Sequence, residues 1–265
     1  MLNNFPACWR ITSKYEGGYT ANKADPGNWT GGKVGVGELK GTNMGISAAA
    51  FPNLDIKNLT AAQAATIYQR KYWDAVRGDD LPAGLDLATW DYGVNSGPAR
   101  AARDLQAVIG AGVDGTIGNE TIAKAKAVNG VKAIQGLCAK RLGFLRNLAI
   151  WNTFKGGWSA RVANVEAKAV AMFLAASPYS TPETVKAALA KEATDARGKA
   201  VNTQSAAATA ATSAIPVTAV AVQSSHVWYW VAAAVAAVLV GGAILIERHK
   251  HAARSAAYAE AAANV

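Results

Sequence analysis

Histidine and cysteine are scarce in this chain of 265 residues. All three histidines lie at or beyond position 226, and the two cysteines, Cys8 and Cys138, have neither metal-ligand spacing nor the density of a disulfide scaffold. A zinc centre in the body of the chain would have almost no ligands to draw on. We therefore expect no metal and no other cofactor, and two buried thiols in preference to a disulfide bond.

The chain also lacks a run of lysine or arginine interleaved with aromatic residues, so nucleic acid is disfavoured as a partner. Its formal net charge is +9, and residues 1–195 contribute +6 of this, from 22 Lys/Arg and 16 Asp/Glu. A basic body suits an anionic polymer such as the cell wall, because the summed charge steers encounter. Solubility alone explains the same charge equally well.

No apolar core of a signal peptide is present in the N-terminal stretch MLNNFPACWRITSKYEGGY. The long apolar run lies near the other end, at residues 227–246, where twenty uncharged residues would span about 30 Å as a helix. We predict a transmembrane helix there, in contact with membrane lipid. The basic residues after this helix favour a C-terminus inside the cell and a body outside it. The N-terminus, however, offers no signal peptide to export the body, so the orientation stays open.

Helical patterns dominate the rest of the chain. They cover residues 3–15, 60–77, 84–96, 98–109, 119–128, 130–150, 160–176 and 182–198. The exception is residues 25–45, where seven glycines and a proline predict a glycine-rich β-hairpin or looped excursion. The expected fold class is therefore mainly α, with one small β excursion.

Two carboxylates, Glu16 and Asp25, flank the turn-rich stretch EGGYTANKADPG. One continuous helix would hold them about 13 Å apart along its axis, but the two glycines end the helix and the following turn can bring Asp25 back toward Glu16. One protonated and one ionised carboxylate are the minimum for cleaving a glycoside. The alternatives are a surface role for Glu16 and a purely structural turn role for Asp25, which precedes Pro and Gly.

Four motifs in order, EGGYTANKADPG, GTNMGIS, YWDAVRGDDLP and WDYGVNSG, resemble glycoside hydrolase family 108, the lysozyme-like N-acetylmuramidases. The segments DLQAVIG, VDGTIGNET and RLGFLRNLAIWNTFKGGWSARV are similar to the helical peptidoglycan-binding module that accompanies this family. Together they cover residues 7–170. The resemblance implies a lysozyme-like helical body that needs no cofactor.

By this resemblance, Glu16 would be the general acid at the β-1,4 bond between N-acetylmuramic acid and N-acetylglucosamine. Asp25 would act as base or electrostatic stabiliser, and Thr42 would orient the water; the alternative for Thr42 is a turn residue without a catalytic role. For Asp91, a structural bond inside a helical pair is the alternative to lining the cleft. The residues predicted to contact substrate are Gly17, Gly18, Tyr19, Asp91 and Asn95.

The resemblance and the composition together predict six segments. They are a muramidase catalytic domain at 1–95, a helical peptidoglycan-binding module at 96–180, a connecting helix at 181–199, a flexible Ala/Thr/Ser linker at 200–226, the transmembrane helix at 227–246 and a short tail at 247–265. The binding module is expected to pack against the catalytic domain as one body.

These observations predict an endolysin-like peptidoglycan hydrolase that acts in phage-type lysis or in wall remodelling for secretion. It would be a monomeric, single-pass protein of the bacterial inner membrane, encoded by phage or host, and would act on periplasmic peptidoglycan. Its expected partners are peptidoglycan, membrane lipid and a holin or other pore. Two alternatives stay open: a lytic transglycosylase, which needs no second carboxylate, and a non-catalytic membrane-tethered peptidoglycan-binding anchor.

Overall fold

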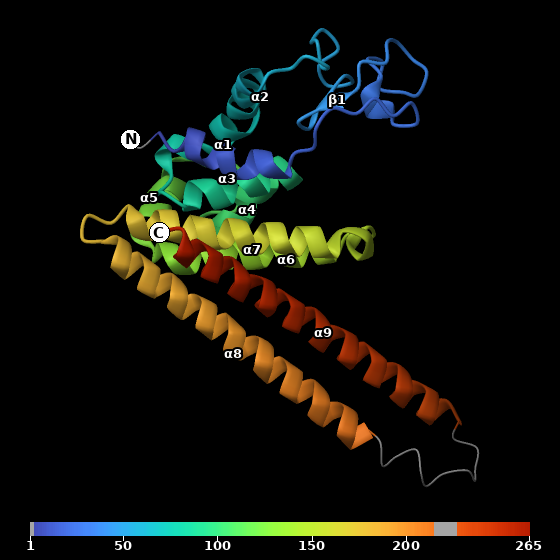
Figure 1. Cartoon of the computed structure of the whole chain (residues 1–265), viewed down its shortest axis with the longest axis vertical. Helices are drawn as coiled ribbons and strands as arrows, with labels where there is room; N and C mark the ends of the chain where they lie inside the picture. Colours follow the sequence, from blue (N-terminus) through green and yellow to red (C-terminus); the bar gives the residue numbers. More distant parts are fainter. Residues whose placement is uncertain (1–2, 215–226) are drawn as a thin grey trace. The chain divides into compact units, whose positions relative to one another are not determined.

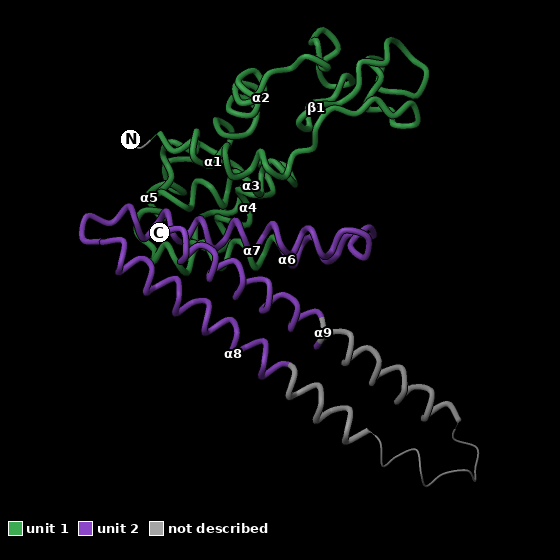
Figure 2. Tube along the Cα trace, in the orientation of Figure 1, with its two compact units in different colours: residues 1–141 green, residues 142–265 purple. Residues whose placement is uncertain are grey.

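The structure is a computed structural model that describes residues 3–214 and 227–265 (Figure 1). Within these ranges, side chains are described for all residues except 204–214, 227–243 and 245. The chain divides into two compact units, residues 1–141 and 142–265 (Figure 2). Both units consist mainly of helices, which confirms the predicted fold class.

The first unit begins with helix α1 (Phe5–Thr12) and ends within helix α6. Two helix starts have clear local causes: Thr60 and Gln63 form a capping box, and Pro98 occupies a first helical turn. The other α-helices are α2 (Ala61–Tyr68), α3 (Leu85–Ser96), α4 (Pro98–Ile109), α5 (Asn119–Ala127) and α6 (Gly130–Arg146). Shorter turns of helix are η1 (Ser13–Tyr15), η2 (Pro26–Asn28), η3 (Gln69–Trp73), η4 (Asp74–Val76) and η5 (Gly78–Asp80).

A two-stranded antiparallel sheet lies within the glycine-rich excursion. Strand β1 (Thr42–Asn43) pairs with strand β2 (Ile46–Ser47), and Thr42 lies opposite Ser47. The two connecting residues, Met44 and Gly45, both have positive φ, at 47° and 71°. Such backbone angles match the twist of a tight two-residue hairpin. The small β excursion predicted from the glycines is therefore confirmed.

Aromatic packing anchors α1 in the first unit. The Phe5 ring meets Trp73 and Trp90 edge to face, with ring centroids 5.5 and 5.7 Å apart. Both tryptophans are fully buried, so Trp73 belongs to the core. Cys8 and Cys138 are buried and free, as expected from their spacing. This core holds the end of α1, and with it Glu16, at a defined place.

The second unit contains helices α7 (Trp151–Ala175), α8 (Pro182–Ala214) and α9 (Val227–Ala263). α9 lies alongside α8 and also packs on α7 (Figure 1). Glu166 on α7 is almost fully buried and accepts hydrogen bonds from Arg254 Nε at 2.8 Å, Arg254 Nη2 at 2.6 Å and the Tyr258 hydroxyl at 3.0 Å. Residues 247–263 are thus a packed helix and differ from the short tail predicted there.

The boundaries between segments also differ from those predicted. Helix α8 continues to Ala214, which makes the first part of the predicted linker helical, and alanine's high helix propensity accounts for this. The remainder, residues 215–226, lies outside the described residues. The first unit ends at Arg141, inside the predicted binding module, because α4 packs on α3 and Arg141 pairs with Asp91.

The predicted transmembrane segment at 227–246 forms the first half of α9. Its side chains, apart from those of Ile244 and Ile246, are outside the described part of the chain. Within the described part, no helix is both long enough and apolar enough to cross a membrane. The transmembrane prediction therefore has no support in the structure.

Candidate active site

Glu16 directly follows the turn of helix that ends α1. Its backbone is extended, with φ −90° and ψ 127°, and its N–H donates to the Ser13 carbonyl at 3.2 Å. The next carbonyl, that of Gly17, accepts from the N–H of Met44 at 2.9 Å. The segment that carries the half-buried Glu16 is therefore fastened to the turn of the β hairpin.

Gly45 lies against the Glu16 carboxylate. A Cβ at this position would lie 2.8 Å from Glu16 Oε2 and would overlap the Tyr68 hydroxyl oxygen. The two oxygens thus border the same small space, which only glycine leaves open. The positive φ of 71° favours glycine here for a second, independent reason.

Two tyrosines of the neighbouring helical segment complete this side of the site. The Tyr68 hydroxyl donates to the Met44 carbonyl at 3.0 Å, and its ring packs against those of Trp9 and Tyr72. Burial raises the pKa of Tyr72, and the nearby negative charge of Glu16 raises this pKa further. Sequence reasoning gave Tyr68 no part in the site, because an aromatic residue at helical spacing is typical of a core.

Thr42 lies at the other end of the hairpin. Its N–H and C=O pair with the C=O and N–H of Thr20, each at 2.8 Å. Its hydroxyl donates to Asn28 Oδ1 at 2.6 Å, and the buried Asn28 amide donates to the Asn22 carbonyl at 3.0 Å. The direction of the Thr42 hydroxyl is therefore set by a buried amide.

Asp25 is exposed and has a clear local function. Its Oδ1 accepts from the Gly27 N–H at 2.8 Å and caps η2, while its own N–H donates to the Asn22 carbonyl at 3.1 Å. The Asn22 carbonyl also accepts from Asn28, so hydrogen bonds connect Asp25 with Thr42. Thr42 and Gly45 belong to the same β hairpin, so the hairpin connects Asp25 and Thr42 with Glu16 and Tyr68.

The surface that follows Glu16 is open. Gly17 and Gly18 are exposed, and a Cβ at either position would meet no atom within 4 Å. The surrounding protein would therefore accept a side chain at either position. The space that the two glycines leave empty is available to a ligand. Tyr19 is 42% exposed and its ring lies on the backbone of Gly41, where a Cβ would come within 2.8 Å of Tyr19 Cε2.

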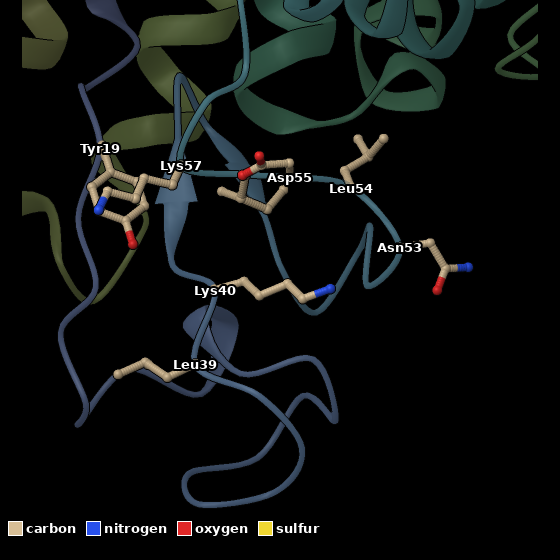
Figure 3. Close-up of a pocket in the computed structure, with 8 residues that line it drawn as sticks. Tyr19, Leu39, Lys40, Asn53, Leu54, Asp55 and Lys57 are labelled. Atoms are coloured by element: carbon tan, nitrogen blue, oxygen red, sulfur yellow. The ribbon is translucent and has the colours of Figure 1, made fainter.

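A cavity of about 410 Å³ opens beside Tyr19 (Figure 3). Asn43, the neighbour of Thr42 on β1, donates from its side-chain amide to the Ile56 carbonyl at 3.1 Å, which ties the cavity to the hairpin. The cavity is lined by Tyr19, Leu39, Lys40, Asn53, Leu54, Asp55, Ile56 and Lys57. Sequence reasoning found only Tyr19 among these residues.

The structure corrects the substrate contact predicted for Asp91. This carboxylate is fully buried, where Arg141 Nη1 donates to it at 2.6 Å and the Thr12 hydroxyl at 2.8 Å. It holds α1, α3 and α6 together and cannot reach a sugar. Asn95 lies half-buried in the last turn of α3 and accepts from the Ser96 hydroxyl at 3.0 Å, so its contact with substrate stays a prediction.

Comparison with known proteins agrees with the motifs. The family described as glycosyl hydrolase 108 matches residues 9–97. The solved structure of Brucella abortus SagA is 38% identical to this chain, and the likeness covers 65% of this chain and 97% of the SagA chain with a TM-score of 0.55. No curated protein matches. The chain, with its glutamate beside a glycine-rich hairpin, belongs to the glycosyl hydrolase 108 family of lysozyme-like peptidoglycan hydrolases.

Proposed function

We propose that this glycoside hydrolase is an N-acetylmuramidase, which cleaves the β-1,4 bond between N-acetylmuramic acid and N-acetylglucosamine with Glu16 as general acid. The observation that carries the proposal is the position of the Glu16 carboxylate. It adjoins Gly45, where no side chain fits, and it precedes Gly17 and Gly18, where the surface is open. The surface at Gly17 and Gly18, next to Glu16 in the chain, is therefore open to a sugar chain.

In this mechanism the Glu16 carboxyl gives its proton to the glycosidic oxygen as the bond from that oxygen to the anomeric carbon breaks. Water then bonds to the anomeric carbon and loses a proton, either to Asp25 or to the Glu16 carboxylate formed in the first step. Thr42 is suited to orient this water, because its hydroxyl hydrogen is already donated to Asn28 and its oxygen can accept from the water. Asp25 serves as base or as electrostatic stabiliser of the positive charge on the sugar.

The test compares the full chain with its Glu16→Gln variant on purified peptidoglycan. Mass spectrometry of the soluble fragments identifies the new glycan ends. The proposal expects reducing N-acetylmuramic acid ends from the natural chain and their loss in the variant. Glu260→Gln is the matched control, because Glu260 is an exposed glutamate on α9, which belongs to the second unit. Equal release by the Glu16→Gln variant would exclude Glu16 as the acid.

A lytic transglycosylase is the second candidate, and one observation favours it. The Asp25 carboxylate already caps a turn through Gly27, which is the structural role that a non-catalytic aspartate would have. A transglycosylase forms anhydro ends and needs no residue to activate water. Anhydro ends, with activity retained in Asp25→Asn, would support this candidate. Fragments absent despite wall binding would instead indicate a non-catalytic anchor.

A further inference from the structure

We propose that the cavity beside Tyr19 binds the acidic stem peptide that N-acetylmuramic acid carries, so that the enzyme recognises peptide-bearing glycan. The inference rests on the proposed function and extends it from the sugar bond to the substrate class. Nothing in the family match or in the likeness to SagA assigns this cavity a ligand.

The charges around the cavity suit a ligand with carboxylates. Lys40 and Lys57 contribute two ammonium groups, and Asp55 contributes the one carboxylate. Asp55 already accepts from Asn58 through both oxygens, from the side chain at 2.9 Å and from the backbone at 3.3 Å. The Asn58 side chain is the main reason that the pKa of Asp55 is lowered. Lys40 also lies 3.4 Å from Glu38, so Lys57 is the ammonium group that can turn its charge toward an anionic ligand.

The two lysines differ in how firmly they are held. Lys40 Nζ donates to the Pro52 carbonyl at 2.8 Å and lies 3.4 Å from Glu38, so its position is defined before any ligand binds. Lys57 is exposed at the rim and can turn toward a ligand. A carboxylate there would receive charge-assisted hydrogen bonds, which are stronger than neutral ones.

The rest of the lining suits a short peptide. Leu39, Leu54 and Ile56 offer apolar contacts for small side chains such as alanine, and Asn53 offers an amide for the peptide backbone. The volume of about 410 Å³ falls within the range of small-ligand sites. Because Asn43 bonds the Ile56 carbonyl, the cavity is fixed to the hairpin that also carries Thr42.

The distance from the reacting sugar also fits. Tyr19 follows Glu16 by three residues, so their Cα atoms are at most about 11 Å apart along an extended chain. Gly17 and Gly18 place no side chain between them. An extended peptide of three residues has about the same length. A stem peptide attached to a sugar at Glu16 can therefore reach the cavity over an open surface.

The first experiment measures hydrolysis by the full chain on two substrates: intact peptidoglycan, and the same material after an amidase has removed its stem peptides. Lys57→Gln should raise KM on intact peptidoglycan about tenfold, with kcat unchanged and with no effect on the peptide-free glycan. Lys57→Arg should restore the KM. Lys33→Gln is the control, because Lys33 is exposed on the same excursion and does not line the cavity.

The second experiment measures binding of the amidase-released stem peptides to the Glu16→Gln chain by calorimetry. Binding that is lost in the additional Lys57→Gln change supports the inference. Absence of peptide binding overturns the inference. A Lys57→Gln effect on KM of equal size for both substrates also overturns it, because the cavity would then bind sugar and not peptide. If the chain hydrolyses neither substrate, the proposed function fails while this binding measurement still decides the inference.

Discussion

Two carboxylates in the first unit, Glu16 and Asp91, lie in regions built in opposite ways. Glu16 follows the helical turn after α1 and lies against the glycine-rich excursion, where it is half-buried beside an open surface. Asp91 belongs to the helical body, where it is fully buried and bonded to Arg141 and Thr12. Motif position made both candidates for the site. Burial separates them, because a buried charge needs partners that then exclude substrate.

The two regions are also stabilised differently. The helical body packs leucine, isoleucine and tryptophan side chains around α3. The excursion relies on backbone hydrogen bonds, such as Thr30 N–H to Glu38 C=O and Gly31 N–H to Val36 C=O, and on glycines where a Cβ would clash. Charged side chains such as Lys33 and Glu38 are exposed in the excursion, which suits chemistry on a polar polymer.

The largest effect is expected for Glu16→Gln. Removing the general acid should lower the rate of glycan cleavage about 10³-fold, since positioned acids contribute that order of rate. The midpoint of thermal unfolding should stay within about 2 °C of that of the natural chain, because the site lies outside the helical core. Cleavage and unfolding are measured on the same preparations. A large fall in the midpoint would place Glu16 with the structural carboxylates.

Asp91→Asn should show the reverse pattern. Loss of the charge leaves Arg141 buried without its ion pair, at a cost of about 3–5 kcal/mol in the free energy of unfolding. Urea unfolding measures this loss, and Asp79→Asn, an exposed aspartate of the same unit, is the control. If stability were retained while activity vanished, the contrast between the two carboxylates would not hold.

Arg254→Met applies the comparison to the second unit. Of the hydrogen bonds to the buried Glu166 described above, this change leaves the one from the Tyr258 hydroxyl. The end of α9 should then come away from α7, with a loss of about 3 kcal/mol in the free energy of unfolding. Limited proteolysis should then cut within residues 247–263. Unchanged protection would show that the other contacts of this helix, such as the buried Tyr258 and the ion pair between Arg146 and Glu247, are enough to hold it. If residues 227–246 crossed a membrane once, Arg254 and Glu166 would lie on opposite sides of it and could not bond. Protection of residues 247–263 from protease in the natural chain therefore also tests for such a crossing.

Gly45→Ala should reduce both activity and stability. The new methyl group would press on the Glu16 carboxylate and the Tyr68 hydroxyl, and we expect cleavage to fall about tenfold or more. The matched control is Gly110→Ala, because Gly110 has the same φ of 71° but open space around it. Both variants should lose about 1 kcal/mol from backbone strain. Equal activity in the two would argue against contact at Glu16.

The last effect depends on pH and concerns Asp86, which is buried and bonded to the Asn4 side chain and the Leu87 N–H. Burial raises its pKa from 3.8 to about 6 in the folded chain. The folded state therefore binds this proton more tightly, so the contribution of Asp86 to stability should rise by up to about 2 kcal/mol as pH falls from 7 to 4. Urea unfolding across this range should show a smaller rise in Asp86→Asn. An identical pH dependence would contradict the assignment.

Much of the fold follows from local sequence. The capping box at Thr60 and Gln63, the proline at 98 and the glycines between 25 and 45 predict helix starts and a hairpin through short-range chemistry. Local sequence did not reveal that α9 packs on α7, because the partners Glu166 and Arg254 lie 88 positions apart.

The same division holds for the site. The sequence by itself determined the family and the helix end that presents Glu16, because these depend on adjacent residues and on motif order. Only the tertiary structure decided that Gly45 and Tyr68 border the Glu16 carboxylate and that Asp91 is buried. Contacts between distant residues depend on how the hairpin and the helices pack, and spacing along the chain does not encode them.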